Sequence, residues 1–218
     1  MNRPLRLATV ALTASAALLL SSCGSGDDES KDNDKIAGAD KAGEERSASP
    51  SASDPAGAAR PKVELPSDVK LFFKPEQTGD AAKDAILRDN SDFIRALNAA
   101  IVAGDPRLPA LEFFTEGEAA ASSQSWVKAF KNAGWTVTGT VKYFNRQVTV
   151  KSKTAASLTY CGDESKGYSK VIKTGQVKRT KVTKRSYILY GAQVEKNQEG
   201  VWELVKITST RGAAVCQP

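Results

Sequence analysis

The side chains most able to do chemistry in this chain are its three cysteines, Cys23, Cys161 and Cys216. The 218-residue sequence contains no histidine. This absence excludes a Ser-His-Asp triad, a Cys-His dyad and every zinc site that uses imidazole. Three cysteines are also too few for a zinc site built from cysteine alone. We therefore predict no metal and no cofactor, and any catalysis would depend on Asp, Glu, Lys, Tyr or Ser.

Carboxylates within the apolar segments are the remaining candidates for acid-base catalysis. There are few of them, namely Asp84, Asp89, Asp92, Glu112 and Glu203. Helical periodicity is expected to turn most of these side chains toward solvent. We therefore assign no catalytic residue from the sequence.

The N-terminus has the pattern of a secretory signal peptide. Arg3 and Arg6 precede an apolar stretch from Leu7 to Leu20, and small residues follow it. The stretch is shorter than the roughly 20 apolar residues that span a bilayer, which disfavours an uncleaved membrane helix.

The segment Leu20-Ser21-Ser22-Cys23 resembles the lipobox of bacterial lipoproteins. The resemblance implies that residues 1–22 are a removable signal peptide and that the Cys23 thiol carries a diacylglyceryl group. The alternative is an ordinary signal peptide that happens to contain a cysteine. Several acyl chains on one residue anchor a protein stably. We therefore expect a lipid-anchored protein on the outer face of the cell membrane, with the membrane as a partner through the anchor.

A polar segment follows the predicted lipidation site. Residues 24–60 are rich in Ser, Gly, Ala and charged side chains, with nine acidic against five basic residues and no aromatic residue. Such a segment buries too little apolar surface to offset the entropy of ordering it. Residues 23–60 are thus predicted to form the lipidated cysteine and a disordered acidic tether. Residues 61–218 are predicted to form a single basic domain.

Two helices are expected at the start of this domain. Apolar residues recur at helical spacing from Asp80 to Ala103, with Asp80 as N-cap, Gly104 at the C-terminal end and Pro106 beyond it. A short element is predicted around 108–114. A second helix is predicted over 118–133 and is ended by Gly134.

Alternating residues then predict strands. Trp135 to Tyr143 alternates apolar with polar side chains, and shorter alternating runs lie at 147–151 and 158–160. Tyr187 to Val194 is apolar on both faces, as a central strand is, and Val201 to Thr208 closes the chain after a turn. Helices followed by an antiparallel meander indicate the α+β class.

The element order resembles the nuclear-transport-factor-2-like fold over about residues 67–216. The residues that carry the resemblance are the helix end Ala103-Gly104-Asp105-Pro106 and the strand Gly200-Val201-Trp202-Glu203-Leu204-Val205. The resemblance is strongest to uncharacterised secreted lipoproteins of high-GC Gram-positive bacteria. It implies N-terminal helices packed on a strongly curved antiparallel sheet that forms a cone-like interior. An unrelated α+β sandwich with the same element order is the rival.

Cys161 and Cys216 remain once Cys23 is lipidated. In an exported domain two cysteines most simply form a disulfide. A reactive thiol pair is the alternative, but the sequence has no CxxC motif. We therefore predict a bond that ties the C-terminal tail to the sheet.

The stretch from Lys166 to Arg185 has eight basic residues and no acidic residue. Its candidate contacts to anionic surfaces are Lys178, Arg179, Lys181, Lys184 and Arg185. One interpretation is a soluble edge strand whose lysines prevent pairing between sheets. The other is a surface for anionic envelope polymers or lipid head groups. Nucleic acid is not predicted, because Tyr168 is the one aromatic residue in the stretch that could stack on bases.

The sequence is compatible with three hypotheses for the function of the domain. The first is a non-enzymatic domain that binds a small-molecule ligand or a protein partner at the cell surface. The second is an enzyme of the isomerase or dehydratase type, known in the resembled fold, that uses a buried carboxylate and tyrosines. The third is a structural component of an envelope assembly. The candidate pocket-lining residues are Trp126, Tyr143 and Tyr160, with plain core packing as the alternative.

Overall fold

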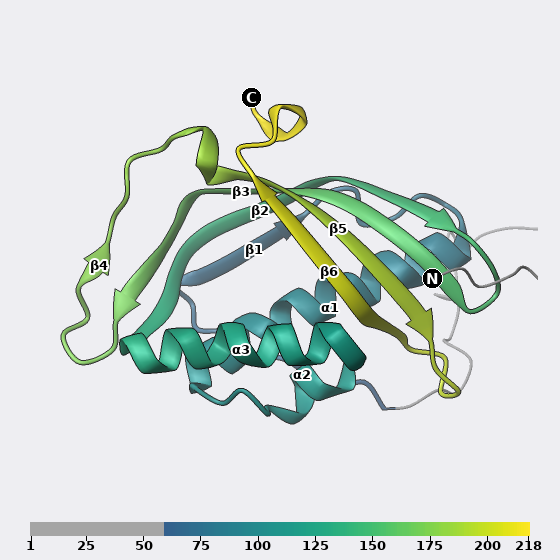
Figure 1. Ribbon diagram of the computed structural model, residues 1–218, viewed down its shortest axis with the longest axis horizontal. Helices are drawn as coiled ribbons and strands as arrows, with labels where there is room; N and C mark the ends of the chain where they lie inside the picture. The colour runs from purple at the N-terminus through teal and green to yellow at the C-terminus, as the bar shows by residue number, and fades with distance from the viewer. Residues whose placement is uncertain (1–58) are drawn as a thin grey trace, which may run out of the picture. The chain divides into compact units, whose positions relative to one another are not determined.

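The computed structural model describes residues 59–218. The predicted signal peptide, Cys23 and nearly all of the predicted tether lie outside the described residues. The described part contains helices α1 (Ala81–Ala103), α2 (Pro109–Phe113) and α3 (Gly117–Ala133). Its strands are β1 (Val69–Phe73), β2 (Trp135–Val150), β3 (Ala155–Val171), β4 (Val177–Lys178), β5 (Tyr187–Lys196) and β6 (Trp202–Arg211). Figure 1 shows the helices along one face of a curled sheet, which confirms the α+β class.

The helix ends follow the capping residues that the sequence provides. The Asp80 side chain accepts hydrogen bonds from the backbone N–H groups of Ala82 and Lys83, which satisfies two free donors at the start of α1. Gly104 and Gly134 adopt left-handed conformations that end α1 and α3. The predicted bounds of both long helices are therefore confirmed to within a residue.

The sheet has strand order β1-β2-β3-β5-β6, and β4 pairs with the end of β3. β2, β3, β5 and β6 pair antiparallel, as expected. β1 was not predicted from the sequence. It pairs parallel to β2, with Val69 opposite Gly139. Residues 135–151, predicted as two short runs, form essentially one long strand, and β3 extends well beyond the predicted 158–160.

The curvature of the sheet comes from irregularities in β2. Its pairing with β3 shifts register twice, and Asn145 lies in the second shift with a φ of 50°. Extra residues of this kind bend a strand and increase its twist. Gly139 has a φ of +94°, and a Cβ atom there would lie 2.2 Å from the carbonyl oxygen of Lys166. Only glycine fits this close approach of β2 to β3.

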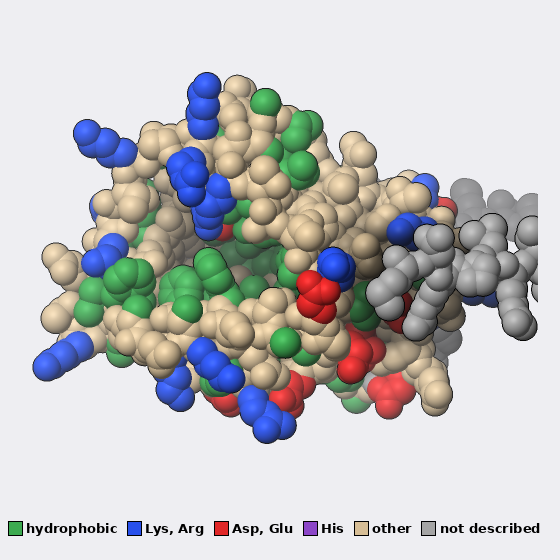
Figure 2. Space-filling model, in the orientation of Figure 1, with side chains coloured by type: hydrophobic (Ala, Val, Ile, Leu, Met, Phe, Trp, Pro, Cys, Tyr) green, Lys and Arg blue, Asp and Glu red, His purple; other side chains and the backbone are tan. Residues whose placement is uncertain are grey.

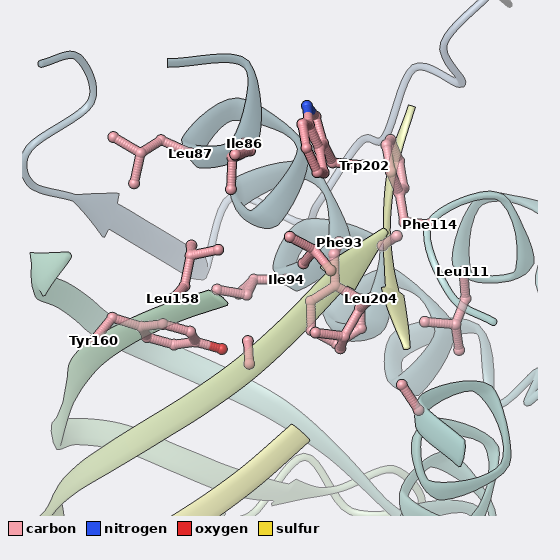
Figure 3. Close-up of a cluster of buried hydrophobic side chains, with 14 of the residues drawn as sticks. Ile86, Leu87, Phe93, Ile94, Leu111, Phe114, Leu158, Tyr160, Trp202 and Leu204 are labelled. Atoms are coloured by element: carbon pink, nitrogen blue, oxygen red, sulfur yellow. The ribbon is translucent and has the colours of Figure 1, made fainter. Parts of the chain in front are cut away.

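The hydrophobic core fills one end of the space between helices and sheet. Figure 3 shows Phe93 and Ile94 of α1 close to Leu204 of β6, with Tyr160 of β3 directed toward them. All four side chains are buried. The core therefore joins the first helix to strands more than 60 residues away in sequence, which makes the fold dependent on long-range contacts.

Asp89 departs from the expectation that helical carboxylates face solvent. It lies on the inner face of α1 and is fully buried. Its carboxylate accepts hydrogen bonds from Arg60 at 2.5 and 3.2 Å and from the backbone N–H of Trp202 at 2.9 Å. Arg60 was placed at the end of the predicted tether. In the structure Arg60 instead belongs to the folded domain, because its guanidinium pairs with the buried carboxylate of Asp89.

Arg146 is a second buried charge, at the bulge of β2. Its guanidinium donates to the carbonyl oxygens of Pro75 and Leu87 and to the side chains of Asn90 and Ser91. It also lies 5.2 Å from the ring of Phe73. Burial lowers the pKa of Arg146 to about 10. These contacts fasten the bent part of β2 to α1.

The predicted disulfide between Cys161 and Cys216 is present, with a Cα–Cα distance of 5.4 Å. It attaches the C-terminal tail to β3 at Cys161, which is paired with Leu189 of β5 in the sheet. Among residues 59–218, no helix combines the length and the apolar character needed to span a membrane.

Candidate functional site: an apolar cavity with a polar end

A cavity of about 850 Å³ lies between the helices and the concave face of the sheet. Figure 2 shows it as a hollow open to solvent, with hydrophobic side chains inside and Lys and Arg side chains along one side of its opening. Its volume is within the range of 300–1,000 Å³ that is usual for small-molecule sites. The helix layer covers only part of the concave face, so the sheet curves around a space that the core leaves empty.

Apolar side chains from three sets of elements form the wall. They are Phe93, Leu97 and Ile101 of α1, Trp126, Ala129 and Phe130 of α3, and Leu71, Val137, Val141, Ile188 and Ile207 of the strands. Trp126 is 49% exposed although it is large and apolar, and it packs against Phe130 with 5.6 Å between ring centroids. A wall of this kind favours an apolar molecule.

The cavity has one polar end, formed by Glu164, Tyr190 and Arg211. The Tyr190 hydroxyl donates to Glu164 Oε1 at 3.2 Å, and Arg211 donates to Glu164 Oε2 at 3.0 Å. Burial, followed by the charge of Glu164, raises the pKa of Tyr190 well above its ordinary value. The phenol therefore stays protonated and acts as a hydrogen-bond donor. Both oxygens of the carboxylate are engaged, so a substrate proton would compete with Tyr190 or Arg211 for Glu164.

The three candidate pocket residues separate in the structure. Trp126 and Tyr143 line the cavity. Tyr160 is instead fully within the core, 6.1 Å from the ring of Tyr143, and its hydroxyl is turned toward Asn90 and Arg146. Burial raises the pKa of Tyr160 to about 12, which the nearby Asn90 side chain and the charge of Arg146 partly oppose. The prediction that Tyr160 lines the pocket is therefore corrected. Tyr160 is a core residue that packs against Tyr143.

Two basic residues of the 166–185 stretch, Lys178 and Arg179, lie against aromatic side chains of the cavity wall. Lys178 lines the cavity with its ammonium 4.7 Å from the Trp135 ring. The Arg179 guanidinium lies 5.1 Å from the ring of Tyr168, another wall residue. Both distances are within the range of cation–π attraction. The segment after Lys178 is not a strand. The basic side chains in it therefore do not alternate between the two faces of the sheet.

The remaining three candidates lie beyond β4. Lys181 and Arg185 line a smaller pocket next to the cavity, whereas Lys184 lines neither. Lys184 begins the 3₁₀ turn η1 (Lys184–Ser186) and is exposed. Of the five candidates, Lys178 thus lines the cavity and Lys181 and Arg185 line the smaller pocket, whereas Arg179 and Lys184 line neither.

Sequence reasoning missed Glu164, Tyr190 and Arg211. They lie on three different strands, and Tyr190 and Arg211 follow Glu164 by 26 and 47 residues. Glu164 stands between polar neighbours in a segment that alternation did not identify as a strand. No local pattern marks such a trio, because strand pairing alone brings its members together.

Comparisons with known proteins give fold similarity only. No protein-family model and no curated protein matches the sequence. A ketosteroid isomerase-like protein from Erwinia carotovora atroseptica SCRI1043 is 14% identical, with 61% of this chain and 97% of that chain covered and a TM-score of 0.41. The intermembrane space region of the chloroplast protein ARC6 is 12% identical, with 62% of this chain and 99% of that one covered and a TM-score of 0.42.

No activity is carried over from these similarities, since both TM-scores lie below 0.5. Within the part of the chain that the structure describes, no group of three or more metal-ligating side chains is placed to hold an ion. What the site itself presents is an apolar cavity, open on one side, with a hydrogen-bonded polar end, in a domain of the α+β class whose curled sheet agrees with the nuclear-transport-factor-2-like fold.

Proposed function

We propose that this domain binds an apolar or amphipathic small molecule in the cavity between its helices and its sheet. The single observation that carries the proposal is the open cavity of about 850 Å³ with a largely apolar wall. A cavity of this size is costly to leave in contact with water, because its wall exposes surface that burial would stabilise. A ligand would bury Trp126 together with the inner face of the sheet.

The observed cavity bears on the other hypotheses as well. A filled interior with an exposed apolar sheet face would favour a structural role, but the interior of this domain is open. An isomerase or dehydratase would use Glu164 and Tyr190, which do face the cavity. Arg211 already holds that carboxylate, which supports binding over proton abstraction.

We also propose that the domain acts on the outer face of the cell membrane, attached through a lipidated Cys23. The lipobox-like segment supports this placement. Intact-mass measurement of the membrane-bound form should find an acylated N-terminal Cys23. A Cys23→Ala variant that remains firmly membrane-bound and is processed normally would contradict it.

The binding proposal is tested by titrating the full chain with decanol, an uncharged alkyl probe, and recording tryptophan fluorescence. Two of the three tryptophans, Trp126 and Trp135, line the cavity, so a bound alkyl chain should change their emission. Ala129→Phe places a ring in the cavity and should weaken binding about tenfold or more. Ala121→Phe, on α3 outside the cavity wall, is the matched control and should bind as the parent does. Equal binding by both variants would refute the cavity as the site.

A further inference from the structure

A second, smaller pocket adjoins the apolar cavity. Its volume is about 340 Å³, and it is bounded mainly by polar side chains and backbone. We call it the polar crevice. It is lined by Glu164, Gly167, Thr180, Lys181, Thr183, Arg185, Ser186 and Arg211. Glu164, Gly167, Thr180 and Arg211 also line the apolar cavity, so the two spaces share a wall at the polar end of the cavity.

The polar crevice has an excess of positive charge. Lys181, Arg185 and Arg211 face a single carboxylate, Glu164, whose Oε2 is already paired with Arg211. Within residues 59–218, Lys181 and Arg185 form no ion pair with an acidic side chain. Two cations and the hydroxyl of Thr180 therefore remain for a ligand. Cationic and hydroxyl donors together are suited to the oxygens of a phosphate group.

Local hydrogen bonds hold the backbone of the crevice in place. Thr183 Oγ1 accepts from the N–H of Arg185, and the Thr183 N–H donates to Ser186 Oγ, both at 3.2 Å. Arg211 donates to the carbonyl oxygen of Arg185 at 3.3 Å. These contacts tie the turn to the end of β6. The backbone that carries Arg185 is thus held in place before a ligand binds, which reduces the entropy lost on binding.

We propose that the polar crevice binds the phosphate group of an alkyl phosphate monoester whose chain occupies the apolar cavity. The inference rests on the proposed ligand-binding function and adds the chemical class of the ligand. Each part of the ligand would meet its complement, the chain against α1 and α3 and the phosphate against Lys181 and Arg185. An uncharged chain would leave the cations solvated, and a free phosphate would leave the apolar wall in water.

The test is isothermal titration calorimetry of the full chain with decyl phosphate, decanol and inorganic phosphate, each below its aggregation concentration. Decyl phosphate should bind about tenfold or more tightly than decanol, which corresponds to about 1.4 kcal/mol. Inorganic phosphate at the same concentrations should not bind measurably. Each methylene removed from the chain should weaken binding about fourfold, because burial of one CH₂ contributes about 0.8 kcal/mol.

The variants separate the crevice from general surface charge. Lys181→Gln combined with Arg185→Gln should abolish the preference for decyl phosphate and leave decanol binding unchanged. Lys151→Gln combined with Lys153→Gln removes the same charge at the opposite end of the β2–β3 hairpin and should retain the preference. Both pairs of side chains are exposed, so neither combination should prevent folding.

Four results would overturn the proposal. Equal affinity for decyl phosphate and decanol would remove the phosphate site and leave the apolar cavity as a binding site. Inorganic phosphate that binds as tightly as decyl phosphate would make the crevice a free-anion site. If the Lys151→Gln, Lys153→Gln control lost the preference for decyl phosphate equally, that preference would come from the charge of the whole surface. Such a surface would bind anionic polymers or lipid head groups in the same way. Absence of binding by every probe would refute the cavity function on which the inference rests.

Discussion

The ion pair between Arg60 and Asp89 gives the sharpest test of how the folded domain begins. Asp89 is fully buried, and the Arg60 side chain is 24% exposed. Arg60→Ala would leave the carboxylate with the Trp202 N–H and with Arg88, whose Nε is 3.3 Å away. Loss of one partner of a buried pair costs about 3–5 kcal/mol. Because Arg88 remains and Arg60 is partly solvated, we expect a loss of about 2 kcal/mol in the free energy of unfolding at neutral pH.

The loss should depend on pH with a definite sign. Burial raises the pKa of the Asp89 carboxyl above its ordinary range, and the Trp202 N–H and the charges of Arg60 and Arg88 oppose this rise. Removal of Arg60 raises the pKa of Asp89 further. The folded variant then keeps a proton that the unfolded chain loses at about pH 4, so its stability falls as pH rises through the folded-state pKa. The effect of Arg60→Ala should be smallest at acid pH and complete at neutral pH.

Urea unfolding followed by tryptophan fluorescence measures these differences. Lys62→Ala is the matched control, because Lys62 pairs with Glu64 at the surface, where both side chains are largely exposed, and should change stability by less than about 0.5 kcal/mol. In an Asp89→Asn background, Arg60→Ala should lose most of its effect, since no buried charge remains. If Arg60→Ala unfolds like Lys62→Ala at neutral pH, or if its effect grows toward acid pH, the reasoning is wrong.

Three further predictions concern the sheet. Gly139→Ala should cost at least about 2 kcal/mol, because it combines a strained φ with a Cβ clash, whereas Gly175→Ala, with a positive φ but open space, should cost less in the same urea titration. Arg146→Met should lower the free energy of unfolding by about 3 kcal/mol, since it leaves buried carbonyl and side-chain acceptors unpaired; a change below about 1 kcal/mol would contradict this. Reduction of the Cys161–Cys216 disulfide, 55 residues apart, should cost about 4 kcal/mol in thermal or urea unfolding, and thiol titration of the untreated domain should find neither sulfhydryl free.

Local sequence determined the elements whose signals are contained within a few residues. Asp80 and Gly104 define α1 because a capping side chain and a left-handed glycine act on the backbone beside them. Gly134 ends α3 for the same reason. The disulfide was predictable because only two cysteines remained once Cys23 was assigned to the lipid, so no choice between pairings arose.

Strand pairing was decided by the tertiary structure. β1 is short and joins the sheet at its edge through a partner about 70 residues away, so no alternation within Val69–Phe73 identified it. The bends of β2 depend on where β3 shifts register against it. The volume of the cavity follows from that curvature, and it cannot be obtained from the hydrophobicity of the wall residues, which would serve equally well in a filled core.

The chemistry of the site was likewise decided by long-range contacts. Helical spacing predicted that most helical carboxylates face solvent. Asp89 is buried because Arg60, 29 residues before it, and the N–H of Trp202, 113 residues after it, make burial of the charge tolerable. Tyr160 looked as suitable for a pocket as Tyr143, and the packing of α1 against the sheet placed one in the core and the other at the cavity. A sequence records which side chains are available for burial or charge pairing, while the free energy of each pairing depends on distances that only the folded chain sets.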